Sequence, residues 1–350
     1  YPPYTGTGNF TVTAGTYTYT VTDSKGCTST TTITITEPAL LTSTEDITAS
    51  GSYTWSATGI TYTVSGVYSA TLTTLAGCDS VATLNLTIGG VTIAPKMFLA
   101  GPYVVADGLM HDSLRSQNLV PNFEPYTNPP FNKPSILDAI SSEKFVSNTI
   151  LGVTGPDAIV DWVFVELRDG SNPSVIVATK RALLQRDGDV VSSVDGISPL
   201  YFAFNAAGNY YVSVKHRNHL GVMTATAMPL GLPSTTIDFT TLAPVYFHVA
   251  APPISNAPRK VIGSVSLLWA GDANANKNVK YNGLANDKQE ILNAVGLATP
   301  NATVYGYRRE DVNMDGLVRY NNTDNDKNYI LNNTTGVSTP NSVVSQHTPN

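Results

Sequence analysis

Oxygen-bearing side chains recur at every second position in a short segment near the C-terminus. The segment Asp311-Val312-Asn313-Met314-Asp315-Gly316 has Asp or Asn at positions one, three and five and glycine at position six. Short oxygen side chains at this spacing converge on a hard cation, and the glycine permits the sharp turn that the loop requires. Leu317 at position seven would add a backbone carbonyl. The pattern therefore predicts a structural Ca²⁺ site.

The same pattern occurs once more, 39 residues earlier in the chain. Of the 22 aligned positions that begin at Asp272 and Asp311, 11 are identical, so the motif is duplicated. The earlier copy has an amide at position five and Lys277 at position six, so we predict a firm second site and a weaker first site. The predicted ligands are Asp311, Asn313, Asp315, Leu317 and Asp326 in the second copy and Asp272, Asn274, Asn276, Asn278 and Asp287 in the first.

The residue that closes each loop has two interpretations. No acidic residue lies at position twelve, where an EF-hand loop closes, but a short insertion would bring Asp326, and Asp287 in the first copy, to that place. Alternatively, Asp287 with Glu290 forms a capping box and Asp326 an N-cap. The helices concerned are predicted over 288–295 and 327–332. Val318 at position eight is expected to point into the core.

Catalytic patterns are missing from the sequence. It contains no Gly-x-Ser-x-Gly, His-Glu-x-x-His or phosphate-binding loop. His216 and His219 flank Arg217, and we interpret them as a structural polar cluster, because a metal site wants a carboxylate or thiolate partner. Asp161 and Glu166 alternate to opposite faces of one predicted strand, so they cannot act as a glycosidase pair. We therefore predict no catalytic residues and no enzyme activity.

Residues 96–255 are rich in turn signals and poor in helical pattern, which favours a larger β-sandwich. An exposed Trp162 could stack on saccharide rings, but we favour its interpretation as a core residue. One short helix is predicted over 136–145. The predicted strands are Asp157–Leu167, its hairpin partner Val175–Leu184, Tyr201–Phe204 and Tyr210–Val214.

The first ninety residues alternate threonine with apolar or aromatic residues. Twenty-six of the ninety are Thr, and segments such as 17–22 repeat with a period of two. This alternation is typical of strands with one face in a core and the other in water. The pattern recurs 51 residues later, where Gly66 corresponds to Gly15. We predict two tandem immunoglobulin-like modules, a partial one over 1–38 and a second over 39–95.

The whole chain is thus predicted to be mainly β, with the duplicated loop-helix module over 256–350 as its last domain. Charged residues make up only 13% of the sequence and the net charge is −6, with no basic stripe, which argues against nucleic-acid binding. No apolar run reaches the roughly 18 residues of a transmembrane helix.

Several of these segments resemble known secreted proteins. Gly15–Asp23 with Gly26-Cys27 resembles the Thr-rich repeats of gliding-motility adhesins in Bacteroidetes, and Ser52–Trp55 with Ala76–Leu84 resembles a second repeat of those proteins. The duplicated loop-helix pair resembles the dockerin calcium motif, but lacks an acidic residue at position twelve. The middle block resembles a domain that accompanies the same repeats, through Asp161–Val163, Glu166–Asp169, Gln185–Asp189 and His216–Gly221.

The resemblance implies an extracellular or bacterial cell-surface protein exported by type IX secretion, in which the repeats form a stalk. Its partners would be other surface proteins, copies of itself in a fibre, or glycans. We therefore expect a non-enzymatic structural or adhesive protein stabilised by Ca²⁺. The alternative is a glycan- or protein-binding module of a larger secreted protein or enzyme.

The two cysteines, Cys27 and Cys78, occupy equivalent positions of the two repeats, and we expect both to be buried, free thiols. The second repeat of the adhesin family often has a cysteine where this chain has Ser50, which would otherwise offer a partner. Asp79-Ser80-Val81 and Asp112-Ser113-Leu114 fit the short O-glycosylation pattern of these bacteria.

Overall fold

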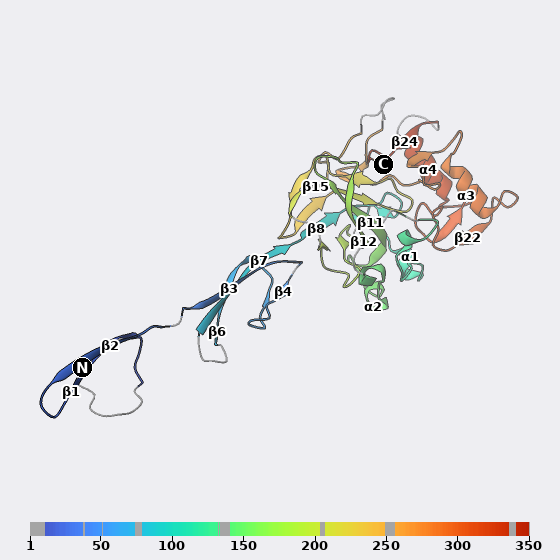
Figure 1. The fold of residues 1–350 in the computed structure, drawn as a ribbon. Helices are drawn as coiled ribbons and strands as arrows, with labels where there is room; N and C mark the ends of the chain where they lie inside the picture. The colour runs from blue at the N-terminus through green and yellow to red at the C-terminus, as the bar shows by residue number, and fades with distance from the viewer. Residues whose placement is uncertain are drawn as a thin grey trace. The chain divides into compact units, whose positions relative to one another are not determined.

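The computed structural model describes residues 11–37, 39–50, 52–73, 79–131, 133, 141–203, 207–248, 256–335 and 341–349. The contacts divide the chain into two compact units, Tyr1–Ile88 and Gly89–Asn350 (Figure 1). The predicted mainly-β class is confirmed. The predicted boundary between 255 and 256 falls inside the second unit. No helix among the described residues is long and apolar enough to span a membrane.

The first unit contains small sheets of Thr-rich strands. β1 (Gly15–Thr22) pairs antiparallel with β2 (Thr28–Ile35) across a turn in which Asp23 Oδ1 accepts hydrogen bonds from the backbone N–H of Lys25 and Cys27, both at 2.8 Å. Cys27 is a free thiol, as predicted, but the prediction that it is buried is wrong, because its side chain is exposed at the end of the turn. Cys78 lies outside the described residues. The other strands are β3 (Leu41–Ser50), β4 (Tyr53–Thr54), β5 (Thr61–Tyr62), β6 (Gly66–Thr73) and β7 (Asp79–Gly89), with the sheet orders β3-β7-β6 and β4-β5.

A small core lies in the β3-β7-β6 sheet region of this unit. Trp55 and Leu84 are its most deeply buried members, with Leu86 and Ala82 beside them. Ile33 and Ile35 of β2 correspond by the repeat to Leu84 and Leu86, yet they are 48% and 41% exposed. The two copies therefore share a hairpin but differ in how far it is covered.

Two sheets share the main core of the second unit. One has the order β13-β12-β11-β15-β16, with β17 also paired to β15; the other has the order β14-β8-β18, in which β18 runs parallel to β8. The strands are β8 (Val91–Lys96), β11 (Ile159–Asp169), β12 (Ile176–Gln185), β13 (Val190–Val191), β14 (Leu200–Phe202), β15 (Gly208–Lys215), β16 (Val222–Met223), β17 (Met228–Leu230) and β18 (Thr235–Asp238). The predicted hairpin of β11 and β12 is confirmed.

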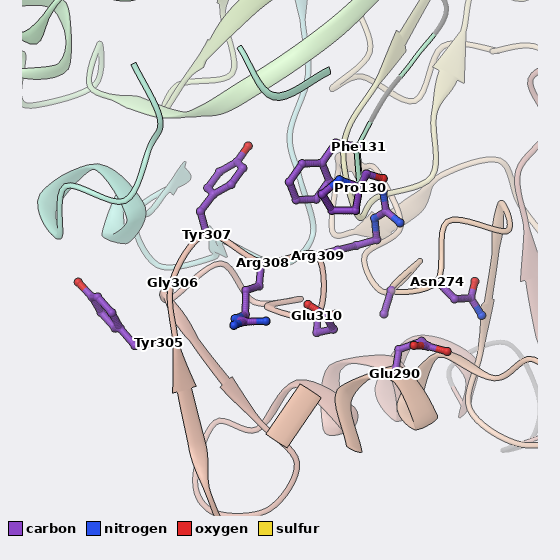
Figure 2. A pocket seen from close by; sticks show the side chains of 11 residues that line it. Pro130, Phe131, Asn274, Glu290, Tyr305, Gly306, Tyr307, Arg308, Arg309 and Glu310 are labelled. Carbon is purple, nitrogen blue, oxygen red and sulfur yellow. Dashed lines mark hydrogen bonds between the residues drawn. The ribbon is translucent and has the colours of Figure 1, made fainter. Parts of the chain in front are cut away.

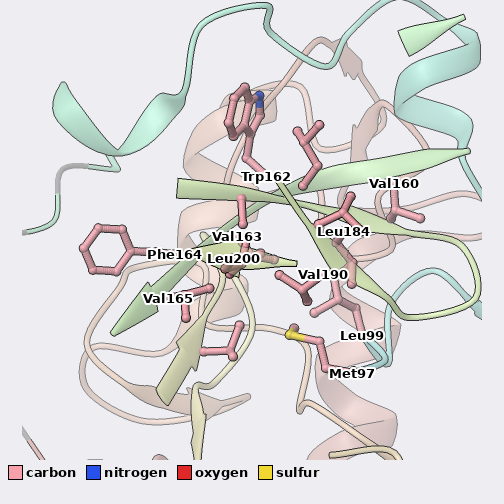
Figure 3. Packing of buried hydrophobic residues seen from close by; sticks show 14 of the residues in the cluster. Met97, Leu99, Val160, Trp162, Val163, Phe164, Val165, Leu184, Val190 and Leu200 are labelled. Carbon is pink, nitrogen blue, oxygen red and sulfur yellow. The ribbon is translucent and has the colours of Figure 1, made fainter. Parts of the chain in front are cut away.

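β11 is buried on both faces (Figure 3). Val163 and Val165 share one core with Leu200 of β14. Trp162 and Phe164 point to the other face, where the indole Nε1 donates to the Pro121 carbonyl at 2.8 Å. Trp162 is therefore a core residue, as favoured from the sequence, and cannot stack on a sugar.

Short helices connect these strands. They are α1 (Ser113–Ser116), the 3₁₀ turns η1 (Pro125–Thr127) and η2 (Ser141–Lys144), and α2 (Asn148–Leu151). Of the helix predicted over 136–145, residues 136–140 lie outside the described residues, and the rest contains η2.

The duplicated motif forms a second core in the same unit. Val279 and Val318, at position eight of the two loops, are fully buried, as expected for Val318, together with Ile291 and Ile330 of the following helices. Figure 1 shows α3 and α4 side by side. The elements of this part of the chain are β19 (Lys260–Ile262), β20 (Val265–Leu267), β21 (Asn278–Lys280), α3 (Asp287–Val295), β22 (Thr303–Tyr305), β23 (Leu317–Arg319), α4 (Asp326–Thr335) and β24 (Val343–Ser345). β9 (Tyr103–Val104) and β10 (Leu109–Met110) form a separate hairpin in the segment after β8.

Backbone contacts join this second core to the sandwich. Leu268 N–H donates to the Phe98 carbonyl at 2.8 Å, and Ala100 N–H donates to the Leu268 carbonyl at 3.0 Å. At Gly101, an added Cβ would lie 2.2 Å from the Val312 carbonyl oxygen. The two chain segments approach so closely that only glycine fits there, which explains why the duplicated motif belongs to the same unit as the sandwich.

This close approach predicts that a methyl group added at Gly101 lowers the stability of the fold. We expect Gly101→Ala to lower the free energy of unfolding by about 1–3 kcal/mol, because backbone must move to admit the Cβ. Gly89→Ala is the matched control, since nothing lies within 4 Å of its added Cβ. Urea unfolding of both variants measures the difference, and equal stabilities would contradict the contact.

Candidate metal centre

The two loops of the duplicated motif share one backbone conformation. Positions four and six have positive φ in both copies, at 59° and 68° for Ala275 and Lys277 and at 63° and 85° for Met314 and Gly316. Residues with a Cβ rarely adopt this region. Lys277 therefore takes up the turn that glycine makes in the second copy, at a cost in backbone strain.

In the second loop, the predicted ligands fold back onto the loop's own backbone. The fully buried Asp311 carboxylate accepts hydrogen bonds from the N–H groups of Asp315 at 3.1 Å and Gly316 at 2.9 Å. Asn313 Oδ1 accepts from Asp315 N–H at 3.1 Å, and Asp315 Oδ1 from Leu317 N–H at 2.9 Å. These turns gather the oxygen atoms of positions one, three and five in one tight loop.

Asp326 returns to the start of this loop from the first turn of α4. Its Oδ1 accepts from Val312 N–H at 2.7 Å, and its Oδ2 accepts from Arg319 N–H at 2.8 Å. Asp287 accepts from Asn274 N–H at 3.2 Å, as Asp326 does from the equivalent Asn313 N–H at 3.4 Å, and from Lys280 N–H at 2.7 Å. Both aspartates thus lie against the loops that they are predicted to close, and their role as metal ligands stays a prediction.

The alternative interpretation of these residues as helix caps is wrong. The N-cap of α3 is Asn286, whose Oδ1 accepts from Gln289 N–H at 3.0 Å. Asn325 makes the same contact with Asn328 N–H at 3.1 Å. Because the preceding asparagine caps each helix, the aspartate carboxylate is free to turn toward the loop.

Each loop buries two carboxylates that form no ion pair with a described Lys or Arg, although Arg217 partly offsets the charge of Asp311 and Lys133 and Arg309 that of Asp272. Among the described residues, no Lys or Arg lies at ion-pair distance from Asp272, Asp287, Asp311 or Asp326, and Asp272 Oδ1 is buried without a hydrogen-bond partner. Burial raises the pKa of Asp272 to about 6, of Asp311 to about 7 and of Asp287 to about 8. The pKa of Asp326 rises well above its usual range through burial and the neighbouring Asp311.

The other predicted ligands differ from one another in their hydrogen-bond and ion-pair partners. Asp315 Oδ2 forms an ion pair with Arg319 at 2.6 Å. The amide nitrogens of Asn274 and Asn276 donate to the Ala285 carbonyl at 2.9 and 3.3 Å, so their amide oxygens remain on the loop side. Asn278 Oδ1 accepts from the Ser345 hydroxyl at 2.6 Å, which leaves its backbone carbonyl as the group for position seven.

The acidic side chains of the described loops are too few, by themselves, to coordinate a metal ion. Among the residues that the structure describes, no three His, Cys, Asp or Glu side chains are grouped as a metal site. An ion in either loop would depend on amide and carbonyl oxygens as well, which is the ligand set that calcium accepts. The buried, unpaired carboxylate pairs fit such an ion.

Three side chains of the sandwich hold the second loop, and the sequence contains no signal for them. Asn218 Nδ2 donates to the Asp311 carbonyl at 2.7 Å, Gln117 Nε2 to the Asp315 carbonyl at 2.8 Å, and His111 Nε2 to the Asn313 carbonyl at 3.1 Å. They lie roughly a hundred or more positions away in the chain, so spacing could not have revealed them.

The His216 and His219 pair lies in a buried polar cluster, as interpreted from the sequence. Asp161 accepts from His216 Nε2 at 3.0 Å and from Arg217 Nε at 2.9 Å. Burial alone would raise the pKa of Asp161, but Arg217 and His216 hold it at about 2. Burial lowers the pKa of His219 well below its usual value. Tyr307 also donates to Asp161 at 2.7 Å, so this cluster links the sandwich to the segment before the second loop.

A cleft of about 590 Å³ lies beside the first loop (Figure 2). Arg308, Glu290 and Glu310 line it and form no ion pair among the described residues. The hydroxyls of Tyr305 and Tyr307 are engaged elsewhere, with the Gln117 carbonyl at 3.3 Å and with Asp161. The cleft therefore presents unpaired charges rather than an aromatic platform.

Comparisons with family models, curated proteins and solved structures found no match to this chain. The interpretation of the site therefore depends on its own geometry and chemistry.

The raised pKa values predict how stability depends on pH when no divalent cation is present. The carboxyls of Asp272, Asp311 and Asp287 have a pKa of about 6, 7 and 8 in the folded state, above the unfolded value of about 4. Their contribution is thus present at low pH and is lost as the pH rises through these values. We expect the free energy of unfolding in chelator to fall by about 1 kcal/mol or more from about pH 6.5 to about pH 8.5.

Asp287→Asn provides the comparison, because an amide does not titrate. The difference in unfolding free energy between wild type and this variant cancels the contribution of the histidines. Urea unfolding at both pH values should show a smaller pH-dependent loss for the variant. Equal losses in the two proteins would show that Asp287 is not held protonated.

Proposed function

We propose that the chain is a non-enzymatic, extracellular structural protein whose C-terminal unit is stabilised by calcium. The observation that carries this proposal is the pair of buried carboxylates in each loop, at Asp272 and Asp287 and at Asp311 and Asp326, without a cationic partner among the described residues. Uncompensated buried charge is strongly unfavourable. A bound Ca²⁺ supplies the missing positive charge and acts here as a structural ion.

The chain's own residues would hold the two ions unequally. In the second loop Asp311, Asn313, Asp315, the Leu317 carbonyl and Asp326 are the proposed ligands. In the first, Asp272, Asn274, Asn276, the Asn278 carbonyl and Asp287 take the corresponding places. The second loop contributes one more carboxylate and has glycine at position six. Since calcium affinity follows ligand charge and loop geometry, the second loop should bind more tightly.

The first unit supports the structural side of the proposal. Its strands expose their Thr-rich faces, and Thr16 and Thr18 of β1 meet Thr34 and Thr32 of β2 through their hydroxyls at 3.2 Å. Such uncharged, hydrogen-bonded ladders suit a spacer rather than a reaction centre. We propose a stalk-like role at the bacterial cell surface, with other surface proteins or copies of the same chain as partners.

The cleft favours a second candidate function, the binding of a glycan or a protein segment. Three charged side chains there, Arg308, Glu290 and Glu310, have no ion-pair partner among the described residues. Unpaired charges in a concave site are available to a ligand. This function does not exclude a structural role for calcium in the adjacent loop.

Calcium removal and one exchange in the first loop test the primary proposal. Calorimetric titration of the full chain should resolve two unequal sites, and chelator should lower Tm. Lys277→Gly should tighten the weaker site by about threefold to tenfold, because it removes a positive charge and a strained positive φ near the ion. Gly316→Ala should weaken the tighter site. Two equal sites, or none, would overturn the proposal.

A binding assay tests the second candidate. The full chain should bind members of a glycan array or a peptide library, and Arg308→Ala should weaken that binding at least about tenfold if the guanidinium contacts the ligand. Lys25→Ala is the matched control, since it removes an exposed cation of the first unit. Equal binding by both variants would exclude the cleft as the site.

A further inference from the structure

Asn218 touches both loops of the duplicated motif, although it belongs to the segment between β15 and β16 of the sandwich. We infer that Asn218 is a positioning residue that couples calcium binding at one loop to calcium binding at the other. This inference rests on the proposed function, because it requires that the loops bind calcium.

The main chain of Asn218 holds the first loop. Its backbone carbonyl accepts hydrogen bonds from Gly271 N–H at 3.0 Å and from Asp272 N–H at 3.1 Å. Asp272 is the residue at position one of that loop and the one whose carboxylate oxygen is buried without a partner. The backbone from which this ligand projects is therefore fixed from the sandwich side.

The side chain of the same residue holds the second loop. Asn218 Nδ2 donates to the Asp311 carbonyl at 2.7 Å and to the Arg309 carbonyl at 2.9 Å. Asp311 is position one of the second loop. One residue thus anchors the first ligand of both loops, although these ligands are 39 positions apart.

Asn218 has little freedom to move independently of these contacts. It is fully buried, and its Oδ1 accepts from His219 Nδ1 at 2.8 Å while His219 Nε2 accepts from Gly101 N–H at 3.1 Å. These partners require one amide orientation and one histidine tautomer, with the proton on Nδ1. The neighbouring Arg217 is held by Asp161.

Such an anchor transmits order between the loops. When an ion draws the carboxylate of Asp311 into place, the backbone at that residue becomes fixed, and Asn218 becomes fixed with it. Asp272 then pays a smaller conformational cost when the first ion binds. The effect is reciprocal, because coupling free energy is shared by the two sites.

The test measures the calcium affinity of the first loop in the full chain, with the second loop intact or blocked by Asp311→Asn and Asp326→Asn together. Blocking retains the carbonyl of residue 311. In the wild-type background we expect blocking to weaken the first site by about fivefold or more. With Asn218→Leu, which matches the size of asparagine but cannot donate, the effect should shrink below about twofold.

Asn256→Leu is the control for lost stability. Asn256 is also buried, with Nδ2 donating to the Ser345 carbonyl at 3.0 Å and Oδ1 accepting from Ser345 N–H at 2.9 Å. Among the described residues, its hydrogen bonds do not reach position one of either loop. Because Ser345 also binds Asn278 of the first loop, this variant can change the absolute affinity of the first site, but it should keep the fivefold effect of blocking the second. Asn218→Ser, whose short hydroxyl cannot reach both carbonyls, serves the same test if the leucine variant does not fold.

The outcomes separate the inference from the proposed function. Two ions whose affinities do not depend on each other in the wild-type background would leave the calcium proposal standing and overturn the coupling. An equal loss of coupling in the Asn218 and Asn256 variants would reduce Asn218 to a general stabilising residue and also overturn it. A chain that binds no calcium would overturn both.

Discussion

The second unit depends on how it accommodates buried negative charge. Asp311, Asp326 and Asp287 are fully buried, and Asp272 is almost fully buried. The Lys and Arg side chains that form ion pairs in the described part of the chain pair with other carboxylates. Backbone N–H groups donate hydrogen bonds to these carboxylate oxygens, but they do not neutralise the negative charge. The raised pKa of these groups expresses the same imbalance. A bound divalent cation would neutralise these carboxylates, which is the reason for proposing a structural calcium ion.

The sandwich and the duplicated motif form one compact unit rather than two separate domains. Gly101 admits the Val312 carbonyl, and Asn218, Gln117 and His111 each bind a carbonyl of the second loop. A portable loop-helix module would have to satisfy these carbonyls by itself. In this chain the loops are completed by residues of the sandwich, so the loops and the core should lose stability together.

The two units differ in composition and in the chemistry of their surfaces. Thr-rich strands in the first unit provide uncharged, hydrogen-bonded surfaces, whereas the second unit contains the large core, the charged clusters and the cleft. The buried cluster of Asp161, His216 and Arg217 shows why polar residues that look catalytic in sequence need not be so. Their hydrogen bonds are directed inward, to one another and to backbone.

Residue patterns that are local in the sequence predicted several elements of this fold and of the candidate site. The Asp-x-Asn-x-Asp-Gly spacing predicted the two equivalent loops, and period-two alternation predicted β1. Strand-forming runs bounded by turns predicted β11 and β12, and Val318 was placed in the core. These features all depend on near neighbours. The helix caps were misjudged: Asn286 and Asn325 compete for the same role one position earlier, and only the return of Asp287 and Asp326 to the loops decides between them. Contacts between distant segments lay beyond the sequence. Asn218, His111, Gln117 and Gly101 meet the loops only after the sandwich has folded, and no periodicity or spacing encodes which long-range carbonyl a buried amide will find.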